Sequence, residues 1–384
     1  MSLELQELRD KIKSARNLLG VVETMRGLAA VNIRRAEAVA ARSAAYARTV
    51  HLALHAALSA MEGRSGRDGE AEARVEGAAG RVYERAARPG AARIARRGLG
   101  AAALRTPART ATTGASGLAA AAGGPSRTAA AGTLGRTAAA GTPGREPAPR
   151  SAGWTGDTVA LLITTDMGLC GQFNERIAGY ALALMRRHPE TTFRWVVVGM
   201  RGWERLRDAE AETVELLNAP GSVEAVGNAV AEAFVALSRH YAGDGGGRLL
   251  VVHNRQDDRH IFAPTHRQLA PFEPERWLTW PEDEGPWRTP PQTSPPPEQM
   301  LPFLLREQLH IDLFQAFIQS FAAENAARLS SMRNATDNIE ELLAELEASY
   351  RRERQDVITN ELMELLGGVE AVTAHERADR GSAF

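Results

Sequence analysis

The sequence predicts an α/β fold in which a small, mainly parallel α/β sheet domain is inserted between two long helices that pair as an antiparallel coiled coil. Three observations lead to this prediction. A long stretch near the C-terminus favours helix, the N-terminal stretch repeats apolar residues at heptad spacing, and the residues between them alternate apolar runs with helical segments. Two paired terminal helices around an inserted sheet account for all three.

The C-terminal stretch, Phe303 to Leu366, contains no Pro and no Gly and is rich in residues that lose little freedom in a helix. At about 1.5 Å per residue it would be on the order of 95 Å long, more than an ordinary globular core can cover. We place this helix at residues 299–372 and a polar tail at 373–384. The larger apolar residues share one narrow stripe that needs a partner helix: Leu329, Met332, Ile339, Leu343, Leu346, Tyr350 and Val357.

The partner is predicted at residues 1–62, where alternate steps of three and four residues trace a heptad seam that only Arg26 and Ser43 interrupt. A 3.5-residue repeat sustained over about eight heptads predicts a left-handed supercoil. The alternative is one amphipathic helix among several in a bundle, although bundles seldom need helices this long. The seam residues are Leu5, Leu8, Ile12, Ala15, Leu19, Val22, Arg26, Ala29, Ile33, Ala36, Ala40, Ser43, Ala47, Val50, Leu54, Ala57 and Met61.

A low-complexity insertion follows at residues 63–150, made mainly of Ala, Gly, Arg, Thr and Pro, with RTAAAGT at 127–133 and again at 136–142. It has too little apolar surface to offset its ordering entropy, so we expect it to be disordered. Two interpretations stay open: an Arg-rich arm that binds nucleic acid or acidic lipid, or an insertion that the fold tolerates because loop closure costs little.

A Rossmann-like α/β domain is predicted at residues 151–272. Apolar runs at 159–163, 193–198 and 249–253 read as strands, and 261–272 as a further extended segment. Helices are expected at 175–187 and 223–241, with a short one near 199–207. Residues 273–298, rich in Pro and Trp, read as a linker back to the second long helix.

Composition limits the functional classes. An apolar fraction of 44% allows a substantial core, and a net charge of −1 argues against a globally basic nucleic-acid binder. One cysteine, Cys170, fits a reducing compartment. We expect neither a signal peptide nor a membrane span, because no apolar run is long enough.

No catalytic constellation emerges from the motifs. The turn Gly168 to Gly171 (GLCG) lacks the Lys-Ser/Thr of a P-loop, and the nine His show no metal-ligand spacing. Cys170 has no His near it in sequence, so we interpret it as a packed structural residue. Asp166 is expected to cap the helix that follows it. We therefore expect no enzyme activity in the chain itself, and no cofactor or metal.

Three stretches together resemble the gamma subunit of F-type ATP synthases: VVETMRGLAAVNIRRAE (21–37), TTDMGLCGQFN (164–174) and the run from Ala322 to Val372 that begins AAENAARLSSMRNATDN. They occur in family order. The resemblance implies a non-catalytic rotor shaft that couples ion flow to ATP synthesis or hydrolysis. It also implies partners: the alternating alpha and beta subunits of a hexamer around the shaft, and the epsilon subunit and membrane c-ring at its foot. The expected location is peripheral, on the cytoplasmic face of a bacterial plasma (inner) membrane.

The resemblance also implies contact residues. Met25 matches a methionine facing the beta-subunit lever, and Leu362 to Leu366 match the apolar shaft tip. A charged band on the shaft is expected to meet acidic beta-subunit loops. The predicted coupling residues are Met25, Arg26, Arg34, Arg35, Arg333, Thr336, Asp337, Arg354, Gln355, Ile358 and Thr359.

The sequence departs from the family pattern in two places. Met167 stands where the family has a basic residue, and the insertion at 63–150 replaces a short connection. An alternative function therefore stays open: a coiled-coil scaffold or regulator whose Arg-rich arm binds polyanions. An α/β enzyme that uses Cys170 is a more distant one.

Overall fold

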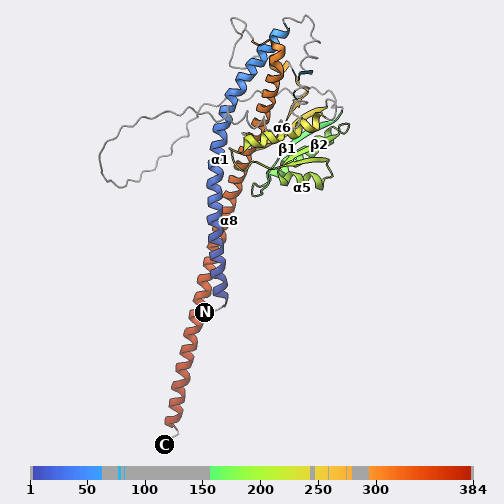
Figure 1. Ribbon diagram of the computed structural model, residues 1–384. Helices are drawn as coiled ribbons and strands as arrows, with labels where there is room; N and C mark the ends of the chain where they lie inside the picture. The colour runs from blue at the N-terminus through green and yellow to red at the C-terminus, as the bar shows by residue number, and fades with distance from the viewer. Residues whose placement is uncertain are drawn as a thin grey trace, which may run out of the picture.

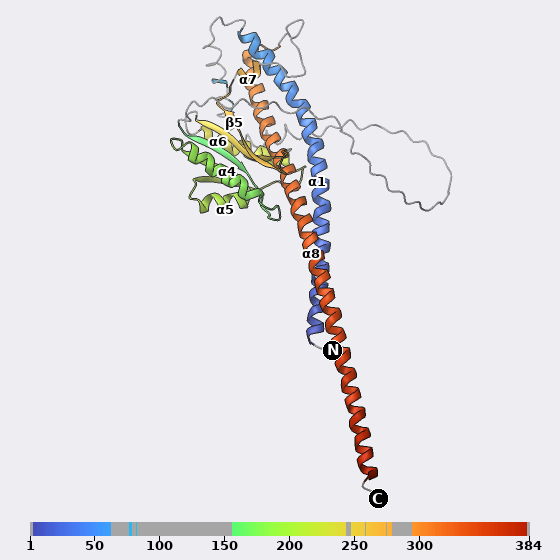
Figure 2. The same ribbon diagram turned by 180° about the vertical axis from the view of Figure 1, so that it is seen from behind.

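Two long terminal helices form an antiparallel rod, and a small sheet domain is attached to one side of it (Figure 1; Figure 2). The computed structural model describes residues 3–62, 77–78, 82, 156–242, 247–257, 259–273, 275–278 and 294–381. Helix α1 spans Leu3–Glu62 and helix α8 spans Pro297–Gly381, with 60 and 85 residues. The predicted fold class, a coiled coil of terminal helices with an inserted sheet domain, is confirmed.

Helix α8 is longer at both ends than we predicted. Pro297 occupies the first helical position, where its missing N–H is no loss, and Pro302 in the second turn disturbs only the bond toward Glu298. At the other end, Gly367 does not stop the helix, which continues to Gly381. Residues 373–381, which were expected to belong to a polar tail, are therefore helical. Among the described helices, none is apolar over enough length to cross a membrane.

The heptad seam of α1 faces α8. Every seam residue is buried or half-buried, and Ala29 and Ala36 are only 1% and 0% exposed. On α8, Met332 and Ile339 are buried against Val22. Hydrogen bonds along the rod show the antiparallel alignment: the Arg9 guanidinium donates to the Tyr350 hydroxyl at 2.8 Å, and the Tyr46 hydroxyl donates to Glu307 at 2.9 Å.

The inserted domain contains one five-stranded sheet of order β3-β2-β1-β4-β5. Strands β1 (Thr158–Ile163), β2 (Phe193–Val198), β3 (Thr213–Leu217) and β4 (Arg248–Arg255) are parallel, and β5 (Ala263–Ala270) is antiparallel to β4. The mainly parallel order is as predicted. We missed β3, a five-residue edge strand whose residues are all half-buried, so neither a long apolar run nor alternation marks it.

Helices cover both faces of the sheet. Helices α4 (Phe173–Arg187) and α5 (Met200–Asp208) pack on one face against Leu162 and Trp195. Helix α6 (Val226–Ala242) and the first part of α8 pack on the other face against Leu161. The sheet is therefore held between its own helices and the rod, as Figure 2 shows.

Most of the predicted insertion at 63–150 lies outside the described residues, so its expected disorder is not addressed by the structure. Two of its described residues, Ala78 and Val82, are 1% and 7% exposed and belong to the core beneath α8. The predicted linker at 273–298 includes helix α7 (Glu275–Leu278), whose Trp277 stacks on Phe272 with ring centroids 5.7 Å apart and is 7% exposed. Both segments thus contribute side chains to packing at the end of the rod where α1 ends and α8 begins.

Candidate functional site

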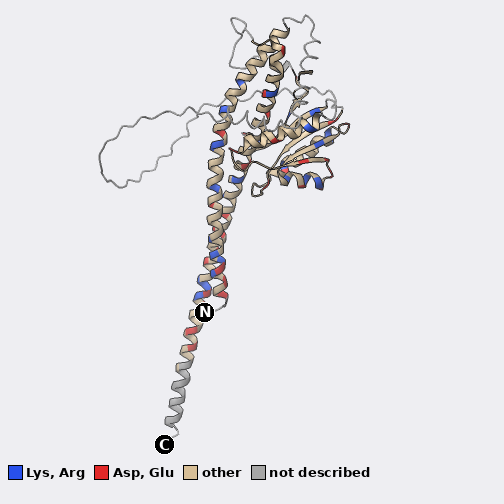
Figure 3. Cartoon of the chain, viewed as in Figure 1, with Lys and Arg blue, Asp and Glu red and all other residues tan. Residues whose placement is uncertain are grey.

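The candidate site is the outer surface of the rod, where most of the predicted coupling residues lie. Met25 and Arg26 are half-buried beside the seam, and Thr336 is buried. The others are exposed: Arg34, Arg35, Arg333, Asp337, Arg354, Gln355, Ile358 and Thr359. Charges of both signs alternate along this surface near the N-terminal end of α1, as Figure 3 shows. One such exposed pair is Arg16 with Glu347 at 2.6 Å.

The structure separates these residues into two levels. Met25 packs against the cluster that contains Met332, so Met25, Arg26 and Arg333 lie at one height of the rod. Residues 354–359 lie beyond Tyr350, which faces Arg9 near the start of α1. The predicted coupling residues therefore lie partly where the two helices pair and partly where α8 continues past the start of α1 (Figure 1).

Thr336 lies inside the rod rather than on its surface. Its side chain is 4% exposed, and its hydroxyl donates to the carbonyl of Met332 at 2.9 Å. A sequence motif marks the residue without telling which way it faces. Its position fits packing between the helices, not contact with a partner.

The sequence analysis missed a second apolar stripe on α1, on a face that does not meet α8. Leu18, Val21, Leu28 and Val31 are 53%, 54%, 60% and 47% exposed. Their spacing of three, seven and three residues was the available signal, because it places them on one helical face. An apolar stripe left in water on a helix marks an interaction surface.

Arg35 links the rod to the inserted domain. Its guanidinium lies 3.9 Å from the Glu224 carboxylate, and the two side chains are 61% and 68% exposed. An exposed pair of this kind contributes at most about 1 kcal/mol. It nevertheless shows that this face of α1 turns toward the loop that precedes α6.

A hydrogen-bonded hub joins the turn after β1 to the next two strand ends. The Asp166 carboxylate accepts from the backbone N–H of Met200 and of Ala219, each at 2.9 Å. Asp166 thus caps α5, not α4, and the prediction that it caps the next helix in sequence is wrong. In a parallel sheet the carboxyl ends of neighbouring strands lie side by side, so a side chain after β1 can reach the loop after β2.

Gly199 closes the hub at a point that has no room for a side chain. Its φ is +93°, and a Cβ there would lie 2.7 Å from the backbone of Thr165. The neighbouring Thr164 hydroxyl donates to the carbonyl of Val198 at 2.6 Å and accepts from the N–H of Gly202 at 3.0 Å. Glycine is needed here for both conformation and space.

Cys170 lies at the junction between the turn and the rod. It is 1% exposed and packs with Phe173, Phe262, Ala323 and Ala327, the last two on α8. Burial, followed by the negative charge of Glu324, raises the pKa of the thiol. A catalytic thiol needs a lowered pKa and access, so this environment fits the predicted structural role.

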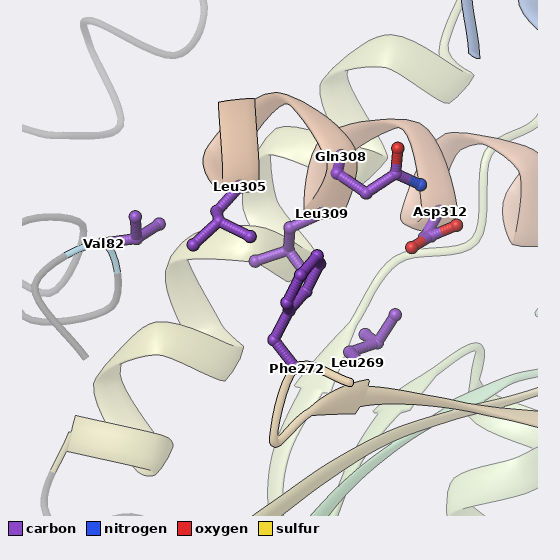
Figure 4. Close-up of a pocket in the computed structure, with 7 residues that line it drawn as sticks. All are labelled: Val82, Leu269, Phe272, Leu305, Gln308, Leu309 and Asp312. Atoms are coloured by element: carbon purple, nitrogen blue, oxygen red, sulfur yellow. The ribbon is translucent and has the colours of Figure 1, made fainter. Parts of the chain in front are cut away.

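A small apolar cavity of about 20 Å³ lies between β5 and the start of α8, lined by Leu269, Phe272, Leu305 and Gln308 among others (Figure 4). Asp312 at its edge is already paired with the Arg267 guanidinium at 2.7 Å. The volume suffices for one water molecule, and the buried Gln308 Oε1 has no hydrogen-bond partner among the described residues. This is a packing void suited to one water and not a substrate site. Within the described part of the chain, no three or more His, Cys, Asp or Glu side chains lie together in a group that could hold a metal ion.

Comparison with known proteins gives a consistent result. The ATP synthase family model matches residues 4–372. The ATP synthase gamma chain of Chlorobium phaeobacteroides is 32% identical over 222 residues, covering 56% of this chain and 73% of that relative. The gamma chain of Gluconacetobacter diazotrophicus is 34% identical over 226 residues, covering 58% and 76%. Among solved structures, the rotor of Euglena gracilis mitochondrial ATP synthase in rotational state 1 matches with a TM-score of 0.47 and 13% identity, covering 92% of this chain and 99% of that one.

The family match runs from the start of α1 to beyond the apolar part of α8 and includes the whole sheet domain. It therefore covers the paired helices, the strand-end hub and the exposed surface together. The chain belongs to the family of ATP synthase gamma chains.

Proposed function

We propose that this chain acts as the central stalk of an F-type ATP synthase, transmitting torque between a membrane c-ring and a hexamer of alpha and beta subunits. The observation that carries the proposal is the rod itself, two paired helices that extend into one longer helix. A shaft must resist bending and twisting, and paired helices with a continuous seam do so better than a single helix. The catalytic sites would then belong to the partners.

Exposed apolar side chains near the C-terminal end of α8 suit a partner that surrounds this end of the helix. Ile358, Leu362, Leu365, Leu366 and Val369 are 46%, 55%, 68%, 61% and 61% exposed, and no α1 residue lies beside them. At about 100° per residue, they share a face roughly a third of a turn away from the α1-facing stripe. This apolar face is thus not a continuation of the coiled-coil seam. It suits an apolar sleeve formed by the top of the hexamer.

The two-helix part offers a different kind of contact. The apolar stripe of Leu18, Val21, Leu28 and Val31 lies on the same helix as Met25 and the charged Arg26, Arg34 and Arg35. Such a surface fits a moving, partly acidic lever of a beta subunit. As the shaft turns, each orientation shifts a partner's open and closed states only by its differential contact energy. Asymmetry of the shaft surface supplies that difference.

The opposite end of the rod, with the sheet domain, is the part that would meet the epsilon subunit and the c-ring. The assembly would then lie peripherally on the cytoplasmic face of a bacterial inner membrane. The alternative of a polyanion-binding scaffold depends on residues 63–150, of which only 77, 78 and 82 are described. No described contact favours that alternative.

Reconstitution with the cognate alpha and beta subunits tests the proposal. We expect the chain to be retained in a purified hexamer and to change its ATPase rate. Leu362→Glu should weaken assembly about tenfold or more, since it places a charge in an apolar sleeve. Asn360→Glu, at another exposed position on the same turn, is the matched control and should have little effect. A hexamer that never retains the chain would refute the proposal.

A further inference from the structure

The middle of the coiled coil has a seam that does not by itself define the alignment of the two helices. Here the α1 seam consists of Ala29, Ala36, Ala40, Ser43 and Ala47, apart from Ile33. Small side chains let the helices approach closely, but they interlock weakly and pack similarly after a shift of one heptad. Something else at this level must distinguish the native alignment from a shifted one.

We propose that a buried polar group, the register cluster of Asn32, Glu324, Asn325 and Arg328, sets the alignment of α1 against α8 and holds both in phase with the sheet domain. Asn32 comes from α1 and the other three from one turn of α8. These would be positioning residues for the shaft.

The contacts converge on one oxygen atom. The Asn32 side-chain amide donates to Asn325 Oδ1 at 3.3 Å, and the Arg328 guanidinium donates to the same oxygen at 3.3 Å. The Asn325 amide donates back to the carbonyl of Phe321 at 2.8 Å, and Arg328 also pairs with Glu324. Asn325 is 1% exposed, and the Arg328 and Glu324 side chains are 16% and 14% exposed. The α8 part of the group is therefore shielded from water, and Asn32 at its edge is half-buried.

A shift of one heptad would break this arrangement in either direction. It would move Asn32 from Asn325 to Ile318 or to Met332, neither of which offers a suitable acceptor. The half-buried Asn32 amide would lose its acceptor and the buried Asn325 oxygen would lose one of its two donors, whereas the alanine contacts beside them would change little. Buried asparagine is known to select alignment in coiled coils for this reason. The cluster thus penalises the shifted states that the seam tolerates.

The same turn of α8 also holds the domain. Ala323 and Ala327, on either side of Asn325, pack against Cys170 of the turn after β1 and Phe173 at the start of α4. Fixing Asn325 against α1 therefore also fixes where α1 lies relative to the domain. If the chain is a stalk, as proposed above, this keeps the partner-facing surfaces of the two helices in a constant relation as torque passes through them.

Cross-linking of the full-length isolated chain tests the inference without requiring any partner. In a Cys170→Ala background, the pair Arg16→Cys with Glu347→Cys reports the native alignment. The 2.6 Å contact joins the ends of two long side chains, so a short bifunctional thiol cross-linker supplies the length that cysteine lacks. Arg16→Cys with Glu340→Cys, or with Arg354→Cys, reports a shift of one heptad, about 10 Å along the helix. With the cluster intact, we expect cross-linking only in the native pair.

Replacing Asn32 and Asn325 together by Leu should raise the yield of the shifted pairs at least about fivefold, while the chain stays folded, because leucine fills the same space. The single variant Asn325→Gln, with Asn32 intact, keeps an amide at this position and should retain the native cross-linking pattern in part. Asn334→Leu, an exposed asparagine on the same helix, is the control and should change nothing. If the double leucine variant forms only the native cross-link, the cluster does not set the alignment, whether or not the chain acts as a stalk.

Discussion

Adding a single methyl group at Gly199 should strongly lower the stability of the sheet domain. With φ at +93° and the Thr165 backbone 2.7 Å from the position of a Cβ, Gly199→Ala must shift two strand ends apart. We expect a loss of several kcal/mol in unfolding free energy, read from denaturant titration of the full chain. Gly179→Ala is the control: it lies within α4 with open space around it and should stabilise the helix by about 0.5 to 1 kcal/mol. Equal effects at the two positions would contradict this explanation.

The sequence predicted that Asp166 caps a helix, but not which helix it caps. Asp166→Asn keeps the size of the side chain but turns one acceptor into a donor that faces the N–H of Met200 or Ala219. We expect about 1 to 3 kcal/mol of destabilisation, seen as a lower Tm. Asp208→Asn, at an exposed position on α5, should stay within about 0.5 kcal/mol. A Tm unchanged by Asp166→Asn would show that the hub does not need its carboxylate.

At the level of the helix pair, the small size of the seam residues is itself a requirement. Ala36 is 0% exposed between α1 and α8, whereas Ala38, two residues further on, is exposed. Ala36→Leu should destabilise the rod by about 1 to 3 kcal/mol, because the helices must separate to admit the larger side chain. Ala38→Leu should have little effect. The comparison is made by thermal unfolding followed by helical circular dichroism, and a smaller loss at Ala36 than at Ala38 would contradict the assigned seam.

Elements with a long repeating signal could be predicted from the sequence, and those defined by neighbours could not. The heptad of α1 and the apolar run of β1 carry their own evidence, since one face or the whole strand is buried. Strand β3 is held by pairing with β2 and by its Glu215 side chain, which contacts Arg239 at 3.2 Å. Neither contact is visible in a local pattern. The candidate site divides in the same way: a motif marks Thr336, but only the three-dimensional register shows that it is buried.

The whole molecule depends on the contact between the sheet domain and the rod, and two buried histidines lie at that contact. His253 of β4 is 3% exposed, and its Nε2 lies 3.0 Å from Gln319 Oε1 of α8. His310 of α8 is 6% exposed and stacks on Phe234 of α6 with ring centroids 4.3 Å apart. For both rings, Nδ1 has no hydrogen-bond partner among the described residues. These buried surroundings therefore favour the neutral form of both imidazole rings.

Burial lowers the pKa of His253 and of His310 from 6.5 to about 4, and nearby arginines add to the effect. Between those two values the unfolded chain binds more protons than the folded one, so stability is full above pH 6.5 and falls as the pH drops toward 4. Each shift corresponds to roughly 3 kcal/mol of stability that is lost as the pH falls, and both histidines lie where the domain meets the rod. In acid titrations of the full chain, we expect the total tryptophan fluorescence to change before helical circular dichroism is lost. The variant His253→Gln with His310→Leu should move that transition to lower pH, and the exposed control His260→Leu should not. If both variants titrate like the unmodified chain, acid acts elsewhere, and the histidines do not control the attachment of the domain to the rod.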